Sequence, residues 1–536
     1  MPVTPHSPLK RAPAQDSSDS DSSDSDSSTS EAQSLDKTKP RAKPTPPESD
    51  VEEEISIISS VDERSEEFEL LDDEVHDTLA HGGHELKTAP LVTREAYASH
   101  RLENDIVQYG VLGKILGRTS QGSCSVPQDS RLYVNTNAPL STFICGVQGS
   151  GKSHTVSVLL ENMFIRDYFP IGELVNPLSG LVLHFGETGS AARPCEAAFV
   201  GRSDLPGVKY APSVVVYVSP SSLKRMTKLY ESLGKSVRVR PLYFEDSELD
   251  AAAFLSLMAV SSSDSAPLYM HVLLSILRGL GDKFSTSAFL RELESKKANF
   301  NPGQLSSLQQ RLDLLQTFMK PRGVESLGPR FKRARITIMD LSDPFIDSAS
   351  ACGIFEVVLR QFERADVGTG KVLLVDEAHK YLSQTKTATG LTKSLLTLIR
   401  QQRHMSMRVI ISTQEPTVVP SVFIDLCSVV ILHRFQSLAW WDQLSKHVSA
   451  DLSVDGTFDM VTKLKTGQAI VIAPAGVGMV DEVASETGNI VAGSNEEASK
   501  PKRILAQFGR RYLLVKTRKR ITMDGGTSLL AVPVEA

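Results

Sequence analysis

The chain has 536 residues, 40% of them hydrophobic, which is enough to bury a large core and to form more than one folded unit. Residues 1–80 carry 21 acidic and 7 basic side chains, a net charge of −14, whereas the remainder carries 43 and 51, a net charge of +8. The five scattered cysteines form no C-x-x-C pair, which argues against a disulfide framework or a zinc site and favours a reducing compartment, nuclear or cytoplasmic. No apolar run approaches the roughly 18 residues of a membrane span, so we expect no membrane partner.

Residues 1–88 form an acidic tail rich in Ser, Asp and Pro. We expect it to be disordered, because it cannot bury enough apolar surface to offset its ordering entropy. Within it, Glu52–Ser59 places a short β-branched run beside acidic residues. This pattern resembles a SUMO-interacting motif, which binds by adding a strand to the edge of a sheet. A chance apolar run in a disordered tail is the alternative.

From residue 89 the composition is that of a globular protein, in which short apolar runs alternate with helical patterns. Runs of this kind are typical of strands that are buried on both faces of a parallel sheet. We predict strands at Thr142–Cys145, Leu181–His184, Ser213–Val218, Val237–Phe244, Ile336–Leu341, Val372–Asp376, Val409–Thr413, Val429–Leu432 and Ala469–Ala473. The expected fold class is therefore α/β with a mainly parallel central sheet.

The strongest functional signal follows the first of these runs, where residues 146–153 fit G-x-x-x-x-G-K-[ST], the phosphate-binding P-loop. A helical pattern follows the loop, so the motif has the strand–loop–helix context that it needs. Lys152 can reach the β- and γ-phosphates, and the Ser153 hydroxyl can ligate Mg²⁺. The residues expected to bind the nucleotide are Gly146, Val147, Gln148, Gly149, Ser150, Gly151, Lys152, Ser153 and His154. A chance glycine-rich turn is the alternative.

Leucines and methionines recur at helical spacing between residues 251 and 330, as in Leu305, Leu308, Leu312 and Leu315. We expect this region to be a helical insertion that divides the nucleotide-binding core. The two parts of the core would then comprise residues 89–250 and 331–485, followed by a basic C-terminal segment, residues 486–536, packed on the core.

The run Val372–Asp376 ends in a carboxylate, and Glu377 directly after it supplies a second one. An apolar strand followed by two adjacent carboxylates is a Walker B pattern. Asp376 would hold Mg²⁺ through water, and Glu377 would polarise the attacking water. A surface strand end with ordinary charges is the alternative. Residues 376–379 also spell DEAH, the name of a helicase class, but the arginine-rich motifs of that class do not follow, and we expect His379 only to begin a helix.

The run Val409–Thr413 is followed by Gln414. If this strand lies beside the Walker B strand, Gln414 can sense the γ-phosphate and pass the nucleotide state to the helix beyond. A polar strand cap is an equal alternative.

The motifs GVQGSGKS, VLLVDEAHKYL, RHMSMRVIISTQEP, VVILHRF and LKTGQAIVIAP together resemble the HerA/FtsK superfamily of RecA-like P-loop ATPases, over about residues 130–480. The resemblance implies a RecA-like fold, ATP and Mg²⁺ as cofactors, and hexameric rings that translocate duplex DNA. It also implies that Arg434 is an arginine finger for the neighbouring subunit, with Arg400 and Arg403 as rivals for that role or for DNA phosphates. Residues 105–135 are short for the β-barrel that archaeal relatives carry.

The function expected from the sequence is Mg²⁺-dependent ATP hydrolysis, with Glu377, Gln414 and Arg434 as catalytic residues and Ser153 and Asp376 as metal ligands. A nucleotide-dependent switch or scaffold with little turnover is the alternative.

The C-terminal stretch Lys500–Arg520 is basic, and two interpretations of it stay open. It is either a nuclear-import or phosphate-contacting strip, or a folded edge strand, Tyr512–Val515, whose charges face solvent.

Overall fold

The structure is a computed structural model that describes residues 84–120, 123–189, 192–257, 268–325, 328–382, 390–448, 450, 456–481 and 503–526. The motif at Glu52–Ser59 lies outside the described residues. Helix α2 (His84–Thr88) is described, and its Leu86 is buried, so the folded chain begins before the expected boundary at residue 88. In the described ranges, no helix combines the length and the apolar character that crossing a bilayer requires.

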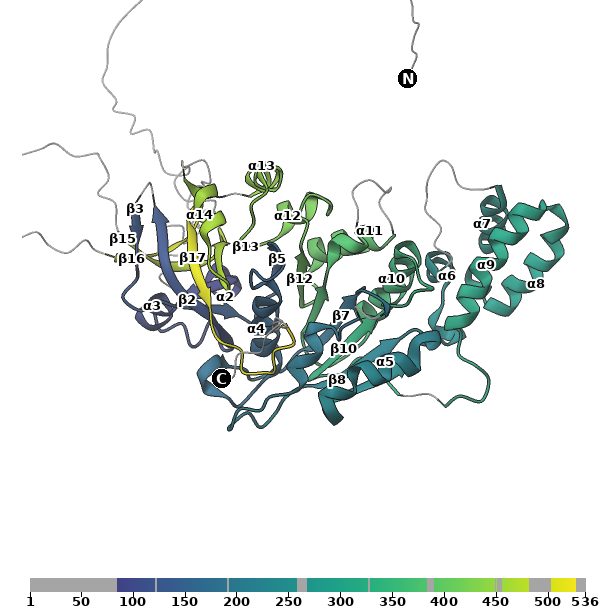
Figure 1. Cartoon of the computed structure of the whole chain (residues 1–536), viewed down its shortest axis with the longest axis horizontal. Helices are drawn as coiled ribbons and strands as arrows, with labels where there is room; N and C mark the ends of the chain where they lie inside the picture. The colour runs from purple at the N-terminus through teal and green to yellow at the C-terminus, as the bar shows by residue number, and fades with distance from the viewer. Residues whose placement is uncertain are drawn as a thin grey trace, which may run out of the picture. The chain divides into compact units, whose positions relative to one another are not determined.

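Parallel strands form the centre of the sheet (Figure 1). Their order is β9 (Val237–Pro241), β8 (Ser213–Val218), β10 (Arg335–Asp340), β7 (Ser179–His184), β11 (Lys371–Val375), β12 (Met407–Thr413), β5 (Ser141–Cys145) and β13 (Val429–His433). β14 (Gln468–Ile472) then joins β13 in the antiparallel direction. All nine predicted strands and the α/β class are therefore confirmed.

One predicted strand is too long, because β9 ends at Pro241 and not at Phe244. Proline has no N–H group with which to continue a ladder, so it is found at the end of a strand or at an edge. Phe244 instead makes an isolated parallel bridge to Met319 and is fully buried.

Mostly antiparallel strands extend the sheet beyond β14. Their order is β17 (Tyr512–Thr517), β2 (Tyr109–Ser120), β4 (Arg131–Asn135) and β1 (Leu91–Thr93), with β3 (Ser123–Ser125) and β6 (Gly172–Glu173) on β2. β15 (Val477–Asp481) then joins β1 in the parallel direction, and β16 (Arg503–Gln507) joins β15 in the antiparallel direction. The expectation of an edge strand at Tyr512–Val515 is wrong, because β17 pairs with a strand on each side. N-terminal and C-terminal chain segments thus build this part of the sheet together.

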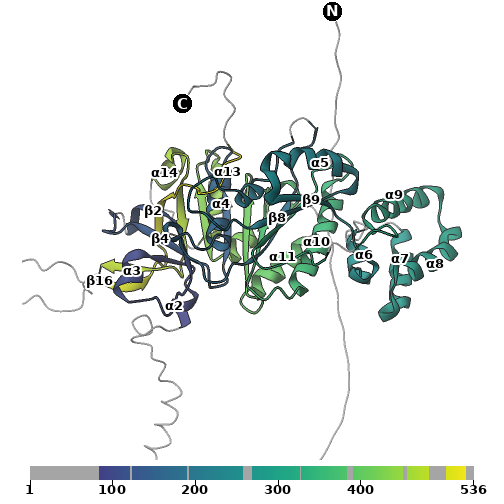
Figure 2. The same ribbon diagram turned by 90° about the horizontal axis from the view of Figure 1, so that it is seen from below.

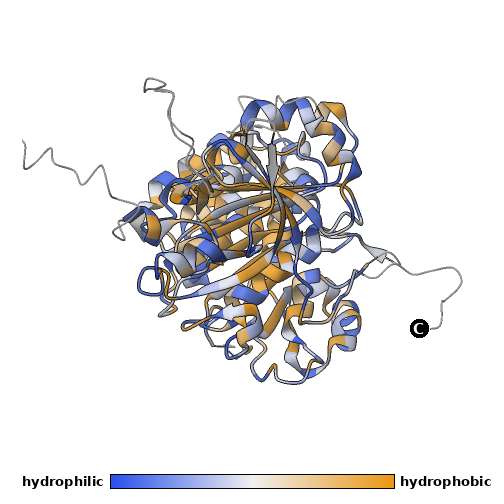
Figure 3. Cartoon of the chain, turned by 90° about the vertical axis from the view of Figure 1, so that its left-hand side faces the viewer, coloured by the Kyte–Doolittle hydropathy of each residue, from blue (hydrophilic) through white to orange (hydrophobic). Residues whose placement is uncertain are grey.

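Helices cover both faces of the parallel strands. Figure 2 shows α4 (Lys152–Phe164) and α5 (Leu223–Tyr230) on one side and α10 (Ser348–Arg364) and α11 (Gly390–Gln401) on the other. Successive residues of one strand serve the two faces: Phe143 packs with the α10 side and Ile144 with the α4 side. Most of these strands accordingly carry hydrophobic residues towards both faces, as the orange strands of Figure 3 show.

The described residues between 251 and 318 are mainly helical. They form α6 (Ala251–Leu257), α7 (Leu268–Leu280), α8 (Thr286–Lys296) and α9 (Pro302–Phe318). α9 begins at a capping box, in which Asn301 and Gln304 each accept a backbone N–H of the other, with Pro302 at the first helical position. Figure 1 shows α7, α8 and α9 beside one another, and α6 packs on α10. The remaining helices are α3 (Arg94–Ser99), α12 (Val422–Leu426), α13 (Leu438–His447) and α14 (Thr457–Lys463).

We predict that Gly353→Ala destabilises the packing of α10 on α6. A Cβ atom at Gly353 would lie 1.9 Å from the Ser256 carbonyl oxygen, so the two helix backbones must move apart. The free energy of unfolding, measured with urea, should fall by about 1–3 kcal/mol. The control is Gly303→Ala in α9, where the nearest atom is 3.5 Å away and the better helix former should leave stability unchanged or raise it by up to about 1 kcal/mol. Equal effects of the two substitutions would contradict the prediction.

Candidate functional site

The predicted P-loop connects β5 to α4. Gly151 is the residue before α4, with φ +112°, and a Cβ atom there would lie 2.7 Å from the Gly467 nitrogen, so both its conformation and its surroundings require glycine. No side chain caps α4. The first N–H groups of a helix have no acceptor within the helix, and with the helix dipole they favour an anion at this end.

A cavity of about 540 Å³ opens above this helix end. The P-loop residues that line it are Gln148, Gly149, Gly151, Lys152, Ser153 and His154. Lys152 is buried, and its ammonium donates a hydrogen bond to the Val147 carbonyl at 3.0 Å. Burial lowers the pKa of Lys152, which the nearby Glu377 and Asp376 carboxylates oppose. The other predicted binding residues, Gly146, Val147 and Ser150, belong to the loop but do not line the cavity.

Glu377 and Gln414 line the same cavity, on the side of β11 and β12. Glu377 follows the Walker B strand with φ +51°, a conformation that is uncommon for a residue other than glycine and is concentrated at functional sites. The Gln414 amide nitrogen donates to both Glu377 oxygens, at 2.7 and 2.9 Å. His379 Nε2 lies 3.4 Å from Glu377 Oε2, and burial lowers the pKa of this histidine. Gln414 therefore contacts the predicted catalytic base directly.

Asp376 does not line the cavity and has a partner that the sequence analysis missed. The His184 Nδ1 atom lies 3.1 Å from Asp376 Oδ2, and Cys195 bonds to the same imidazole. One ligand atom from each of the three residues lies within 4.8 Å of the others. His184 ends β7, which pairs with β11, so the signal was a histidine at the end of a neighbouring predicted strand.

The predicted arginine finger does not reach the cavity of its own chain. The Arg434 carbonyl accepts a hydrogen bond from the Val147 N–H at 3.0 Å, so its backbone supports the P-loop. Its side chain is not part of the cavity wall, and neither are those of Arg400 and Arg403.

His433 contacts α4, the helix that follows the P-loop. The sequence patterns did not indicate this residue. It is fully buried, and its Nδ1 donates to the Gln468 carbonyl at 3.0 Å. Its Nε2 therefore accepts from the Thr155 hydroxyl at 3.0 Å, and Thr155 in turn accepts from Thr517 at 3.0 Å. This chain of bonds joins α4 to the antiparallel strands β14 and β17.

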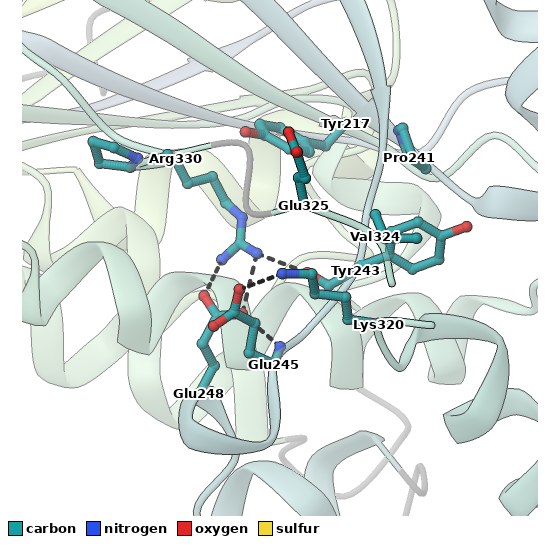
Figure 4. Close-up of a pocket in the computed structure, with 11 residues that line it drawn as sticks. Tyr217, Pro241, Tyr243, Glu245, Glu248, Lys320, Val324, Glu325 and Arg330 are labelled. Atoms are coloured by element: carbon teal, nitrogen blue, oxygen red, sulfur yellow. Dashed lines mark hydrogen bonds and ion pairs between the residues drawn. The ribbon is translucent and has the colours of Figure 1, made fainter. Parts of the chain in front are cut away.

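A second cavity of about 410 Å³ lies between the ends of β8 and β9 and the segment after α9 (Figure 4). Four of its charged groups form two ion pairs: Arg330 pairs with Glu248 at 2.9 Å, and Lys320 pairs with Glu245 at 2.9 Å. Arg330 also donates to the Tyr243 carbonyl at 2.8 Å. These contacts join the segment between β9 and α6 to the segment after α9, and none of the predicted site residues lies here.

No protein-family model and no curated protein matches the chain. Solved structures resemble it in part. VirB4 of Thermoanaerobacter pseudethanolicus has a TM-score of 0.37 and 15% identity, over 68% of this chain and 93% of its own. The bacterial conjugative coupling protein TrwBdeltaN70 has a TM-score of 0.35 and 11% identity, over 68% and 87% of the two chains. The genome packaging NTPase B204 from Sulfolobus turreted icosahedral virus 2, in complex with AMP, has a TM-score of 0.25 and 12% identity, over 62% and 91%. Since these TM-scores lie below 0.5, the likeness says nothing about function.

We predict that His433 makes the fold sensitive to acid. Burial lowers the pKa of His433 from 6.5 to about 3, so the unfolded chain binds a proton between these values and the folded chain does not. Above about pH 6.5 the histidine is neutral in both states and leaves the free energy of unfolding unchanged. As the pH falls from there towards 3, this free energy decreases by up to about 1.4 kcal/mol per pH unit.

The measurement is urea unfolding of the wild type and of His433→Gln at several pH values. Glutamine can keep both hydrogen bonds but does not titrate, so the free energy of unfolding of the variant should fall less steeply between about pH 6 and 4. Parallel curves for the two proteins would show that His433 does not contribute.

Proposed function

We propose that the chain is a Mg²⁺-dependent ATPase. The observation that supports it best is the convergence of Lys152, Ser153, Glu377 and Gln414 on one cavity of about 540 Å³, although the two pairs are more than 200 residues apart in the sequence. A helix end and a lysine suit the phosphates, while a carboxylate at the other wall suits a water nucleophile. Cavities of this size are typical of small-molecule sites.

The residues present fit a magnesium ion, because hydroxyl and carboxylate oxygens are the ligands that this hard cation prefers. Ser153 would bind it directly and Asp376 through water. The His184 bond occupies Asp376 Oδ2 and leaves the other carboxylate oxygen for that water. When bound, the ion would neutralise charge on the phosphate oxygens.

The remaining steps belong to the side chains of the protein. Lys152 holds the phosphates, and Glu377 orients the attacking water and accepts its proton. Gln414 is the sensor. Its amide nitrogen lies 2.7 and 2.9 Å from the two Glu377 oxygens, a geometry in which one N–H is shared between them and the second N–H is directed away from the carboxylate. Binding of the γ-phosphate by that second N–H would couple the ligand to Glu377 through one amide.

We predict that Lys152→Ala abolishes ATP binding or turnover, because it removes the buried cation at the phosphates. Glu377→Gln should bind ATP within a few-fold of the wild type, while its turnover falls by about 10²–10⁴-fold, the contribution of a positioned base. Release of phosphate and equilibrium binding of ATP measure the two effects. Wild-type turnover by Glu377→Gln would refute the role assigned to Glu377.

The finer proposal is a homo-hexameric ring that moves duplex DNA, in a reducing nuclear or cytoplasmic compartment. It rests on the sequence motifs and on the position of Arg434, whose half-buried side chain does not line the cavity of its own chain. We also propose that Glu52–Ser59 of the acidic tail binds a SUMO-like partner.

We predict a hexameric mass and an ATPase rate that rises severalfold with duplex DNA. Arg434→Ala should keep ATP binding but lose turnover, since a finger contributes about 10³–10⁵-fold to the rate. The measurement is the rate with and without duplex DNA, on a sample whose mass is determined by light scattering. A monomer that ignores DNA would instead support a nucleotide-dependent switch.

A further inference from the structure

We propose that the segment Lys516–Gly526 forms a wall of the nucleotide site, and that Lys516 and Lys519 bind the phosphates of a nucleoside di- or triphosphate. The inference rests on the proposed ATP-binding function and assigns part of that site to the basic C-terminal segment. The members of this segment that line the cavity are Lys516, Thr517, Arg518, Lys519, Asp524 and Gly526.

Hydrogen bonds through Thr466 attach Lys516 to the P-loop. Its ammonium donates to the Thr466 carbonyl, and the Thr466 hydroxyl donates to the Gly149 carbonyl at 3.4 Å. The neighbouring Gly467 N–H donates to the Ser150 carbonyl at 2.9 Å. Lys516 therefore stands beside the part of the loop that surrounds the phosphates.

Contacts with α4 hold the segment in place. The Arg518 carbonyl lies 2.7 Å from His154 Nε2, and the Arg518 guanidinium pairs with Glu161 at 2.6 Å. Glu161 is fully buried and also accepts the backbone N–H groups of Ile521 and Thr522, at 3.0 and 2.9 Å. A buried carboxylate with this many donors is strongly held, so the segment is a built part of the site.

The charges of this segment also favour an anion. Arg518 is paired with Glu161, and Glu196 and Asp524, which line the cavity as well, are both paired with Arg520. Lys516 and Lys519, in contrast, are exposed, and no carboxylate in the described part of the chain forms an ion pair with either. Two such cations at the wall of a cavity that already holds Lys152 suit a ligand with several negative charges, and a polyphosphate is such a ligand.

The experiment compares the affinity of the full chain for Mg²⁺-ATP and for inorganic tripolyphosphate. The variants are Lys516→Gln, which can keep the bond to the Thr466 carbonyl without the charge, Lys519→Ala, and both together. Each single change should weaken binding of both probes about tenfold, the usual effect of a hydrogen bond to a charged group. The dependence of affinity on salt should decrease as well.

The matched control is Lys465→Ala, an exposed lysine two positions before Gly467 that does not line the cavity. It should bind both probes as the wild type does, and unchanged melting temperatures should show that the variants fold. If the double variant binds like the wild type, the inference is overturned, while the proposed function stands. If the wild type itself binds neither probe, the proposed function fails first.

Discussion

The parallel ladder of β11, β12 and β5 is the constraint on which the rest of the structure depends. β12 pairs with β11 along one edge and with β5 along the other, with Val375 opposite Ile411 and Thr413 opposite Cys145. Because parallel strands end on the same side of a sheet, the segments that follow them share one edge. The P-loop, the predicted base Glu377 and the predicted sensor Gln414 line one cavity for this reason, and Gln414 contacts Glu377 because its strand is the direct neighbour of β11.

The antiparallel strands complete the site from the other side. They are built from chain ends that lie more than 390 residues apart, since β2 pairs with β17. His433, Thr155 and Thr517 join these strands to α4 through buried hydrogen bonds, and removing one partner of such a bond leaves another polar group unpaired at a cost of about 1–3 kcal/mol. The conformation of the P-loop therefore does not depend on its glycines alone, because buried hydrogen bonds also hold α4 against these strands.

The sequence predicts the strands and the phosphate loop well, because both depend on local patterns. Val429–Leu432 is apolar without interruption, as burial on both faces demands, and the loop needs its glycines and lysine at fixed spacing. For Tyr512–Val515 the sequence offers an edge strand as one of two interpretations, and it does not show the pairing with β2, which depends on residues far away in the sequence. His184 and His433 carry no local motif, because each acts through a partner that only the folded sheet supplies.

The contact between Gln414 and Glu377 ties the end of β12 to the end of β11, where the cavity lies. The Gln414 amide nitrogen lies 2.7 and 2.9 Å from the two Glu377 oxygens. These oxygens are too close together to receive two divergent N–H bonds, so they share a single N–H and the second one is directed away from the carboxylate. The Glu377 backbone lies at φ +51°, an uncommon region that its surroundings must maintain, and this contact is one of them. If Gln414 binds a phosphate oxygen as proposed, one amide would contact the ligand and Glu377 together, from the strand that separates the P-loop from β11.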